Sequence, residues 1–266
     1  FNYYFITTDN GQGKRITSEY STSLPANNYV NTFNDYAVHN NDSLNLIKSG
    51  KIWFGEKFDI INSYSFAFNK PNIVTNANAS IIVDVAASSP VNSTFSINSE
   101  GNVSALSVQS VAQGYNSDYA RQANSTFNFF PNDDIVNIGI SYNKPVSSSV
   151  GWLNYIELNI LRNLVLSGGQ MNFRHIESVN SGNISEFVLS GANSETIVWN
   201  ITDPCNITLM EGTLNGSEFV FRTSTDVLKE FIAHNGTFYH AISNISNVTN
   251  QNLHGLGHYD MVIVTW

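Results

Sequence analysis

Cysteine and histidine are candidates for nucleophilic catalysis in this chain, because a thiolate beside an imidazole base can act as a nucleophile. Cys205 is the only cysteine among 266 residues, so the chain cannot form an internal disulfide. A lone cysteine usually serves as a small apolar residue of the interior. We therefore expect Cys205 to be buried.

Two pairs of histidines have spacings that a metal ion could bridge. His254 and His258 are separated by three residues in a glycine-containing loop, where Asp260 is the nearest further ligand. His234 and His240 flank a glycine turn. Zinc sites require three or four ligands in a compact set, so we expect solvated or hydrogen-bonded histidines instead.

Acidic residues offer two further kinds of site. Asp133 and Asp134 resemble a pair of calcium ligands in a loop, but a turn with exposed acids is the favoured interpretation. A glycosidase needs two carboxylates that face each other across a cleft. The candidates are Glu56, Asp59, Glu157 and Glu186. The sequence pairs no two of them, and no Gly-x-Ser-x-Gly motif is present, so we assign no catalytic, cofactor-binding or metal-ligating residue.

Adjacent aromatic residues could form a platform for sugar rings. In each pair the two rings lie on opposite sides of an expected strand, so one of the two can be exposed. Covering a sheet edge or contacting another domain is the favoured use. The pairs are Tyr3 and Tyr4, Trp53 and Phe54, and Phe129 and Phe130.

Composition excludes several classes of partner. Lys and Arg number 12 against 21 Asp and Glu, which gives a net charge of −9. Such a surface repels nucleic acid and offers no polybasic membrane patch. No run reaches the roughly 20 apolar residues of a membrane-spanning helix. The abundance of Asn, Ser, Thr, Tyr and Phe is typical of a secreted or envelope β-protein.

The longest patterned stretch, residues 151–165, is expected to organise the fold. With period two, Trp152, Ile156, Leu158 and Ile160 share a face, and Asn154 and Arg162 interrupt it. This pattern favours a long central strand, although a four-residue recurrence also fits an amphipathic helix.

Short alternating strands separated by Gly, Pro, Asn and Ser surround that stretch and predict an all-β protein. We expect an antiparallel, jelly-roll-like β-sandwich over residues 1–167, opened by a hairpin over residues 1–20. Residues 21–50 are expected to be irregular, with a short helix over 42–48. A second, smaller β-sandwich is expected over residues 168–257, after Ser167-Gly168-Gly169.

The end of the chain changes character. Met261 to Val264 form a continuous apolar run, as in a parallel strand buried on both faces. We interpret residues 258–266 as the first strand of an α/β domain absent from this chain, and the whole as a piece of a longer precursor.

Several segments carry a family resemblance in the same order along the chain: TTDNGQGKRI, SGKIWFGE, WLNYIELN, SGGQMNFR, VWNITDP, QNLHGL and YDMVIVTW. Together they resemble the region before the catalytic domain of the type IX secretion system sortase, the PorU-like branch of the gingipain-type cysteine peptidases. In VWNITDP, Asn200 replaces the usual acid.

The resemblance implies a parent that removes C-terminal sorting signals from secreted cargo and joins the cargo to lipopolysaccharide. It implies a location at the extracellular face of the outer membrane of Bacteroidota, and an outer-membrane β-barrel partner. His254-Gly255 precedes the apolar strand instead of following it, so a dyad with Cys205 is not expected and the catalytic pair should lie beyond Trp266. This chain would then position the catalytic domain, cargo or partner, and residues 21–50 would contribute to partner contact. The alternatives are a free-standing carbohydrate-binding or adhesive sandwich and a jelly-roll glycosidase.

Overall fold

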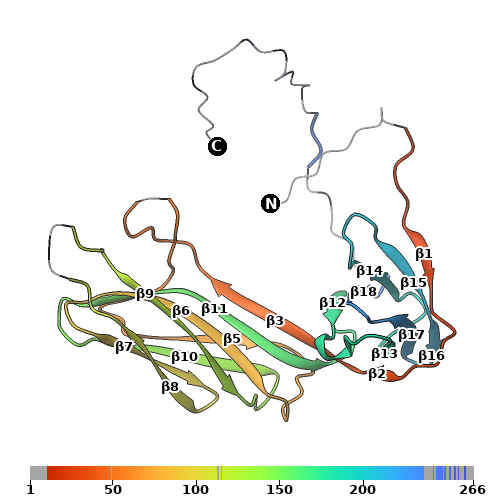
Figure 1. Cartoon of the computed structure of the whole chain (residues 1–266), viewed down its shortest axis with the longest axis horizontal. Helices are drawn as coiled ribbons and strands as arrows, with labels where there is room; N and C mark the ends of the chain where they lie inside the picture. The colour runs from red at the N-terminus through yellow and green to blue at the C-terminus, as the bar shows by residue number, and fades with distance from the viewer. Residues whose placement is uncertain are drawn as a thin grey trace.

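The computed structural model describes residues 11–236, apart from Ser49, Gln113 and Tyr115, and isolated positions beyond 236. Within this part the regular structure is eighteen β-strands and one 3-10 turn, η1 (Ile176–Ser178). The strands form four sheets that pack as two sandwiches (Figure 1). The predicted all-β class and antiparallel sandwich are confirmed.

The first sandwich contains two antiparallel sheets. The sheet that we call the β11 sheet has the order β3-β11-β6-β9, with β4 also paired to β11. Its strands are β3 (Thr32–Asn40), β11 (Val150–Asn163), β6 (Ala79–Ser88), β9 (Arg121–Phe129) and β4 (Lys57–Phe58). The facing sheet has the order β5-β10-β7-β8. Its strands are β5 (Ser63–Asn69), β10 (Ile135–Asn143), β7 (Ser93–Ser99) and β8 (Asn102–Val108).

The core of the first sandwich forms because alternate residues of each strand are apolar and point inward. Ile81, Val83 and Val85 of β6 are fully buried, as are Ile138 and Ile140 of β10. These side chains belong to one continuous cluster. Its burial supplies the main stabilisation of this sandwich.

Strand β11 is the predicted central strand, and it pairs with both β3 and β6. The register with β6 shifts between Leu153 and Tyr155. This bulge reverses the facing of the residues before it. Leu153 therefore joins Ile156 in the core, whereas Trp152 lies on the other face with Phe54 and Ala86.

The second sandwich is smaller. One sheet has the order β1-β15-β14-β18-β12 and the other β16-β17-β13-β2. The first comprises β1 (Thr17–Tyr20), β15 (Thr208–Glu211), β14 (Ile197–Asn200), β18 (Glu230–His234) and β12 (Gln170–Arg174). The second comprises β16 (Thr213–Asn215), β17 (Glu218–Ser224), β13 (Ile184–Ser190) and β2 (Asn28–Val30).

Phenylalanine rings fill the second core. Phe187 lies 5.1 Å from both Phe221 and Phe231, measured between ring centroids. Phe173 stacks on Phe231 at 5.2 Å. Stacked and edge-to-face rings at these distances stabilise a core beyond their buried area.

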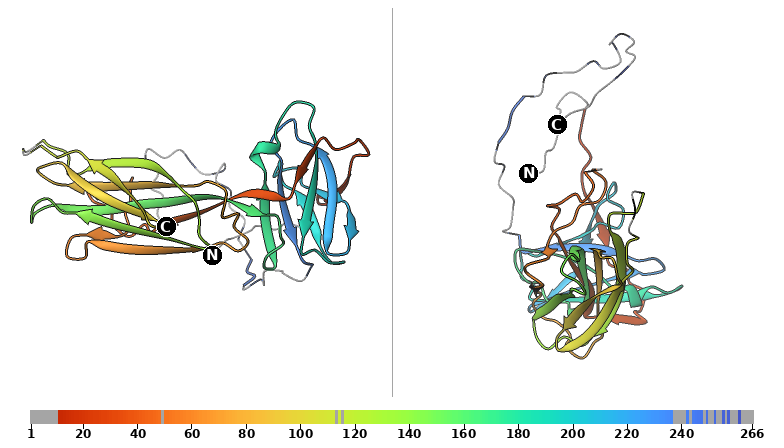
Figure 2. Two further views of the ribbon diagram at one scale, coloured as in Figure 1. Left: turned by 90° about the horizontal axis from the view of Figure 1, so that it is seen from below. Right: turned by 90° about the vertical axis from the view of Figure 1, so that its left-hand side faces the viewer.

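Strand pairing corrects the place of the N-terminal residues, which the expected division assigned to the first sandwich. β1 pairs in parallel with β15, and β2 pairs in parallel with β13, so both belong to the second sandwich. Residues 1–10 of the expected hairpin lie outside the described residues. Local turn signals could not reveal partners that follow about 155–190 residues later. The chain therefore enters the first sandwich through β3 and returns through β12 (Figure 2).

The prediction for residues 21–50 was wrong in two respects. The segment holds β2 and the nine-residue β3, which pairs along its whole length with β11. No helix forms over 42–48, where Leu44 instead makes an antiparallel bridge with Phe54. Polar residues at alternate positions of β3 hid its period-two pattern.

The expected terminal strand, residues 258–266, lies almost wholly outside the described residues, so its assignment stays a prediction. Among the described residues, no helix has the length and apolar character needed to span a membrane.

Candidate functional site

The two sandwiches meet where β3 and β11 leave the first core and β12 and η1 begin. We call this region the junction. Phe33 of β3 and Leu164, just after β11, belong to the second core. Ile160 of β11 belongs to the first core, and Ala37 of β3 packs against it. The same two strands thus contribute to both cores.

Between the cores, these strands carry an ion pair instead of apolar residues. Arg162 Nη1 donates to Asp35 Oδ2 at 2.7 Å, and only 6% of the Arg162 side chain is exposed. The arginine also donates through Nε to the Pro71 carbonyl and through Nη2 to Ser167 Oγ. Its guanidinium lies 4.9 Å from the Phe33 ring centroid. An arginine held by these three hydrogen bonds favours one geometry for the crossing strands.

A lysine from the facing sheet completes this cluster. Lys70 Nζ donates to Asp35 Oδ2 at 3.1 Å and to the Tyr36 carbonyl at 2.8 Å. Asp35 therefore contacts two cations, Arg162 of β11 and Lys70, which directly follows β5 of the facing sheet.

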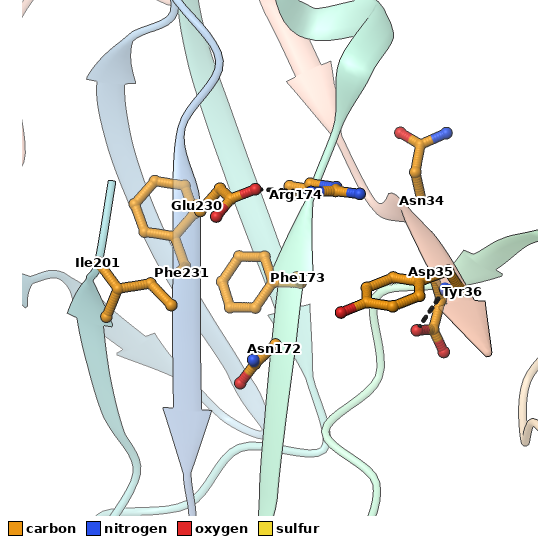
Figure 3. Close-up of a pocket in the computed structure, with 9 residues that line it drawn as sticks. All are labelled: Asn34, Asp35, Tyr36, Asn172, Phe173, Arg174, Ile201, Glu230 and Phe231. Carbon is orange, nitrogen blue, oxygen red and sulfur yellow. Dashed lines mark hydrogen bonds and ion pairs between the residues drawn. The ribbon is translucent and has the colours of Figure 1, made fainter. Parts of the chain in front are cut away.

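A second set of contacts joins β3 to the second sandwich. Arg174 of β12 lies 2.7 Å from Glu230 and places its guanidinium 5.7 Å from the Tyr36 ring centroid (Figure 3). The Ile176 N–H at η1 donates to Asn34 Oδ1 at 2.7 Å. The cation–ring contact of Arg174 with Tyr36 and the hydrogen bond of Ile176 to Asn34 thus cross the boundary, whereas the Arg174–Glu230 pair lies within the second sandwich.

Three hollows of about 100, 320 and 660 Å³ surround the junction. The first is lined by residues that include Tyr36, Arg174, Glu230 and Phe231 (Figure 3). The second lies between the β11 sheet and η1, and the third runs along β3 and the start of β12. The acidic and guanidinium side chains that line the three hollows are Asp35, Arg162, Arg174, Glu177 and Glu230. Asp35 pairs with Arg162 and Glu230 with Arg174, and Glu177 lies 3.7 Å from His175. These charged side chains stabilise the junction and can orient a bound molecule, but they do not include a nucleophile paired with a base.

Of the two residues weighed for a cysteine–histidine dyad, only Cys205 is among the described residues. Cys205 is exposed, so the expectation of burial was wrong. It lies in a turn, where its N–H donates to Asp203 and its carbonyl accepts from Lys14. His254 lies outside the described residues.

The metal candidates have other partners in the described part of the chain. His234 is buried against the Trp199 ring, and its Nδ1 accepts the Gly236 N–H. Asp133 accepts the Ile135 N–H within its own turn, and Asp134 accepts the N–H of Ile73, 61 residues earlier in the chain. His240, His258 and Asp260 are not among the described residues.

The four glycosidase candidates each contact a different neighbour. Glu56 pairs with His39, Asp59 with Lys57 and Lys144, and Glu186 with Arg222. Glu157 accepts from Asn159. None of the four lines the three junction hollows, and Glu186 lies in the other sandwich.

The aromatic pairs behave as expected where they are described. Trp53 is exposed beside buried Phe54, and Phe130 is exposed beside buried Phe129. Tyr3 and Tyr4 lie outside the described residues. The junction residues Asp35 and Arg174 were missed, although Arg162 was visible as a break in an apolar face.

Comparison with known proteins identifies a fold relative. No family model matches the sequence, and no curated protein matches it. A solved structure of dimeric latent PorU from Porphyromonas gingivalis matches with a TM-score of 0.76 and 16% identity, over 91% of this chain and 24% of that chain. This chain thus spans about a quarter of the matched protein.

Carbohydrate-binding modules also match, over about half of the chain. A CBM35 module from Cellvibrio japonicus has a TM-score of 0.32 and 9% identity over 50% of this chain and 95% of its own. A CBM36 module solved with calcium and xylotriose has a TM-score of 0.29 and 13% identity over 47% and 98%. These scores are too low to support an argument.

The PorU match covers 91% of this chain, so the arrangement of both sandwiches is similar to that of the matched part of PorU.

Proposed function

We propose that this chain is the non-catalytic, β-rich region of a cell-surface cysteine peptidase of the type IX secretion system, similar to PorU. Its parent would remove C-terminal sorting signals from cargo and attach the cargo to lipopolysaccharide. The chain would hold the catalytic domain, cargo or partner in place at the outer face of the outer membrane.

The observation that carries this proposal is the coverage of the structural match. The similarity to PorU extends over 91% of this chain and includes both sandwiches, whereas a similarity of single modules would cover only one. The order of the short sequence motifs agrees with the same region.

The junction supports a positioning role. A part that presents another domain must keep its own two halves in a fixed relation. Two strands shared by both cores, and a buried Arg162–Asp35 pair between those cores, serve that purpose here. Rigid supports of this kind hold a distant site in register.

The first test is the parent reading frame. The proposal requires that it continue past Trp266 into alternating strands and helices, with His-Gly after the first strand and a cysteine after a later one. A stop codon directly after Trp266 would remove the sortase and favour a free-standing module.

The second test measures positioning in the parent protein. Arg162→Met should reduce removal of the cargo's C-terminal signal, while peptide cleavage by the catalytic domain in solution stays unchanged. Arg222→Met is the matched control, because its pair with Glu186 lies in the second sandwich away from the junction. Equal cargo processing in both variants and the wild type would contradict a positioning role for the junction.

Contact with the β-barrel partner needs a test other than deletion of residues 21–50. That deletion would remove β2 and β3, so loss of co-purification would report only misfolding. Substitutions of the exposed Leu24 and Ile47, which lie in this segment outside β2 and β3, spare the strands. Their replacement by Ser should reduce co-purification with the barrel partner, and unchanged co-purification would remove this segment from the interface.

A further inference from the structure

The outer face of the β11 sheet, which points away from the first core, is lined by amides and hydroxyls. Because Ile81, Val83 and Val85 face inward, the residues between them face outward. The register aligns the outward positions of the four strands in rows. The outer face comprises Tyr36, Val38 and Asn40 of β3; Asn154, Tyr155, Glu157 and Asn159 of β11; Ser80, Ile82 and Asp84 of β6; and Gln122, Asn124, Thr126 and Asn128 of β9.

Asp84 fixes the centre of this face. Only 3% of Asp84 is exposed, although it lies on the side away from the apolar core. Gln122 Nε2 donates to it at 2.6 Å, Asn154 Nδ2 at 3.0 Å and Asn124 Nδ2 at 3.3 Å. A carboxylate in this setting requires such donors, and in return it sets the orientation of all three amides.

Hydrogen bonds also orient two further amides of the face, Asn159 and Asn128. Asn159 Nδ2 donates to Glu157 at 2.9 Å, and Asn78 Nδ2 donates to Asn128 Oδ1 at 3.2 Å. An amide that donates to a neighbour leaves its carbonyl oxygen as a directed acceptor. The face thus presents oriented hydrogen-bonding groups, and its two carboxylates, Asp84 and Glu157, already accept hydrogen bonds from amides.

The end of the face nearest the second sandwich carries the aromatic ring of Tyr36 and a hollow. Tyr36 is 55% exposed, and Arg174 holds its ring from the second sandwich. Beside it lies the hollow of about 320 Å³, whose lining includes Asn34, Asn78, Ser80 and Asn159. That volume is at the lower end of the range for small-ligand sites, about 300–1,000 Å³.

We propose that the outer face binds a neutral oligosaccharide, with Tyr36 contacting the face of one sugar ring and the amides binding hydroxyl groups. A ligand without charge suits a surface whose carboxylates already have donors. A protein partner is disfavoured, because Tyr36 and Val38 are the only large apolar side chains of this set that are more than half exposed. The proposal is independent of the parent's activity, since a glycan can be bound with or without a catalytic domain.

The test is binding of the full chain to an array of neutral and acidic oligosaccharides, followed by calorimetry on each positive. We expect at least one neutral glycan to bind, and acidic glycans to bind about tenfold more weakly or not at all. Tyr36→Ala and Asn159→Ala should each weaken binding about tenfold, whereas Tyr36→Phe should retain it. Tyr29→Ala and Asn215→Ala are matched controls on exposed positions of the second sandwich and should bind as the wild type does.

Intact lipopolysaccharide and its lipid-free polysaccharide separate two sources of the sugar. Equal binding of both assigns recognition to the glycan, as proposed. Binding of the intact lipid form alone, no binding across the neutral array, or unchanged binding in both folded face variants would each overturn the proposal. Failure of the sortase function in the parent would leave these results unaffected.

Discussion

Arg162 and Asp35 form an ion pair of 2.7 Å that separates two hydrophobic cores on the same pair of strands. Ile160 lies in the first core, and Phe33 lies in the second. The pair therefore lies where β3 and β11 pass from one sandwich to the other. The directional hydrogen bond of this pair favours the alignment in which Arg162 and Asp35 face each other.

Removal of this pair should destabilise the protein strongly. In Arg162→Met, Asp35 keeps Lys70 but loses its closest cation, and the Pro71 carbonyl loses its donor. We expect the free energy of unfolding to fall by about 3 kcal/mol, since a buried charge then lacks its main partner. Urea denaturation measures this change.

The control for that prediction is Arg222→Met. The Arg222 side chain is 37% exposed, so loss of its pair with Glu186 should cost no more than about 1 kcal/mol. A double variant, Arg162→Met with Asp35→Asn, should lose less than the sum of its single changes. Additive losses would mean that the pair does not act as a unit.

Any side chain at Gly151 should lower the stability of the protein, because the facing sheet packs closely against this position. A Cβ atom at this position would lie 2.6 Å from Cζ of Phe95 and 3.2 Å from Cγ of Tyr142, both on the facing sheet. Gly151→Ala should therefore cost about 1–3 kcal/mol through overpacking. Gly139→Ala is the control, because its Cβ would meet Asn98 only at 3.6 Å. A neutral Gly151→Ala would show that the sheets can separate without loss.

Much of the fold follows from local pattern. The alternation in residues 64–68, 81–85 and 136–142 located strands β5, β6 and β10, because one face of each strand is apolar. Strand β3 escaped detection because Asp35 and His39 occupy inward positions where apolar residues are the usual signal. Partners distant in sequence, such as β1 and β15, have no local signature at all.

The candidate sites were harder to predict for a related reason. Arg162 was visible as an interruption of an apolar face, but its partner lay in a segment expected to be irregular. Asp84 stood among outward positions, and the three amides around it come from two other strands. A site assembled across strands depends on register, which the sequence does not specify before the pairing is known.

Burial of His175 should make stability depend on pH. Burial lowers the pKa of His175 below its ordinary value of 6.5, and the nearby Glu177 opposes this effect. The unfolded chain then binds more protons than the folded one as the pH falls below 6.5, so stability is lost in that direction. His175→Gln should show a smaller loss of unfolding free energy between pH 7.5 and pH 5 than the wild type. An identical loss in both would contradict the assignment.

Asp59 should titrate abnormally, and its two lysines should contribute unequally. Hydrogen bonds from Lys144 and then Lys57 lower the pKa of Asp59 to about 2. Because the folded pKa is depressed, the stabilisation is present above the ordinary pKa and is lost as the pH falls towards 2. NMR titration of the Asp59 carboxyl carbon should give this value in the wild type.

Lys144→Met should raise the pKa of Asp59 more than Lys57→Met does. Lys144 lies 2.7 Å from Asp59 and its side chain is 19% exposed, whereas Lys57 lies 2.9 Å away and is 51% exposed. The reverse order would show that solvent exposure does not govern these two contacts.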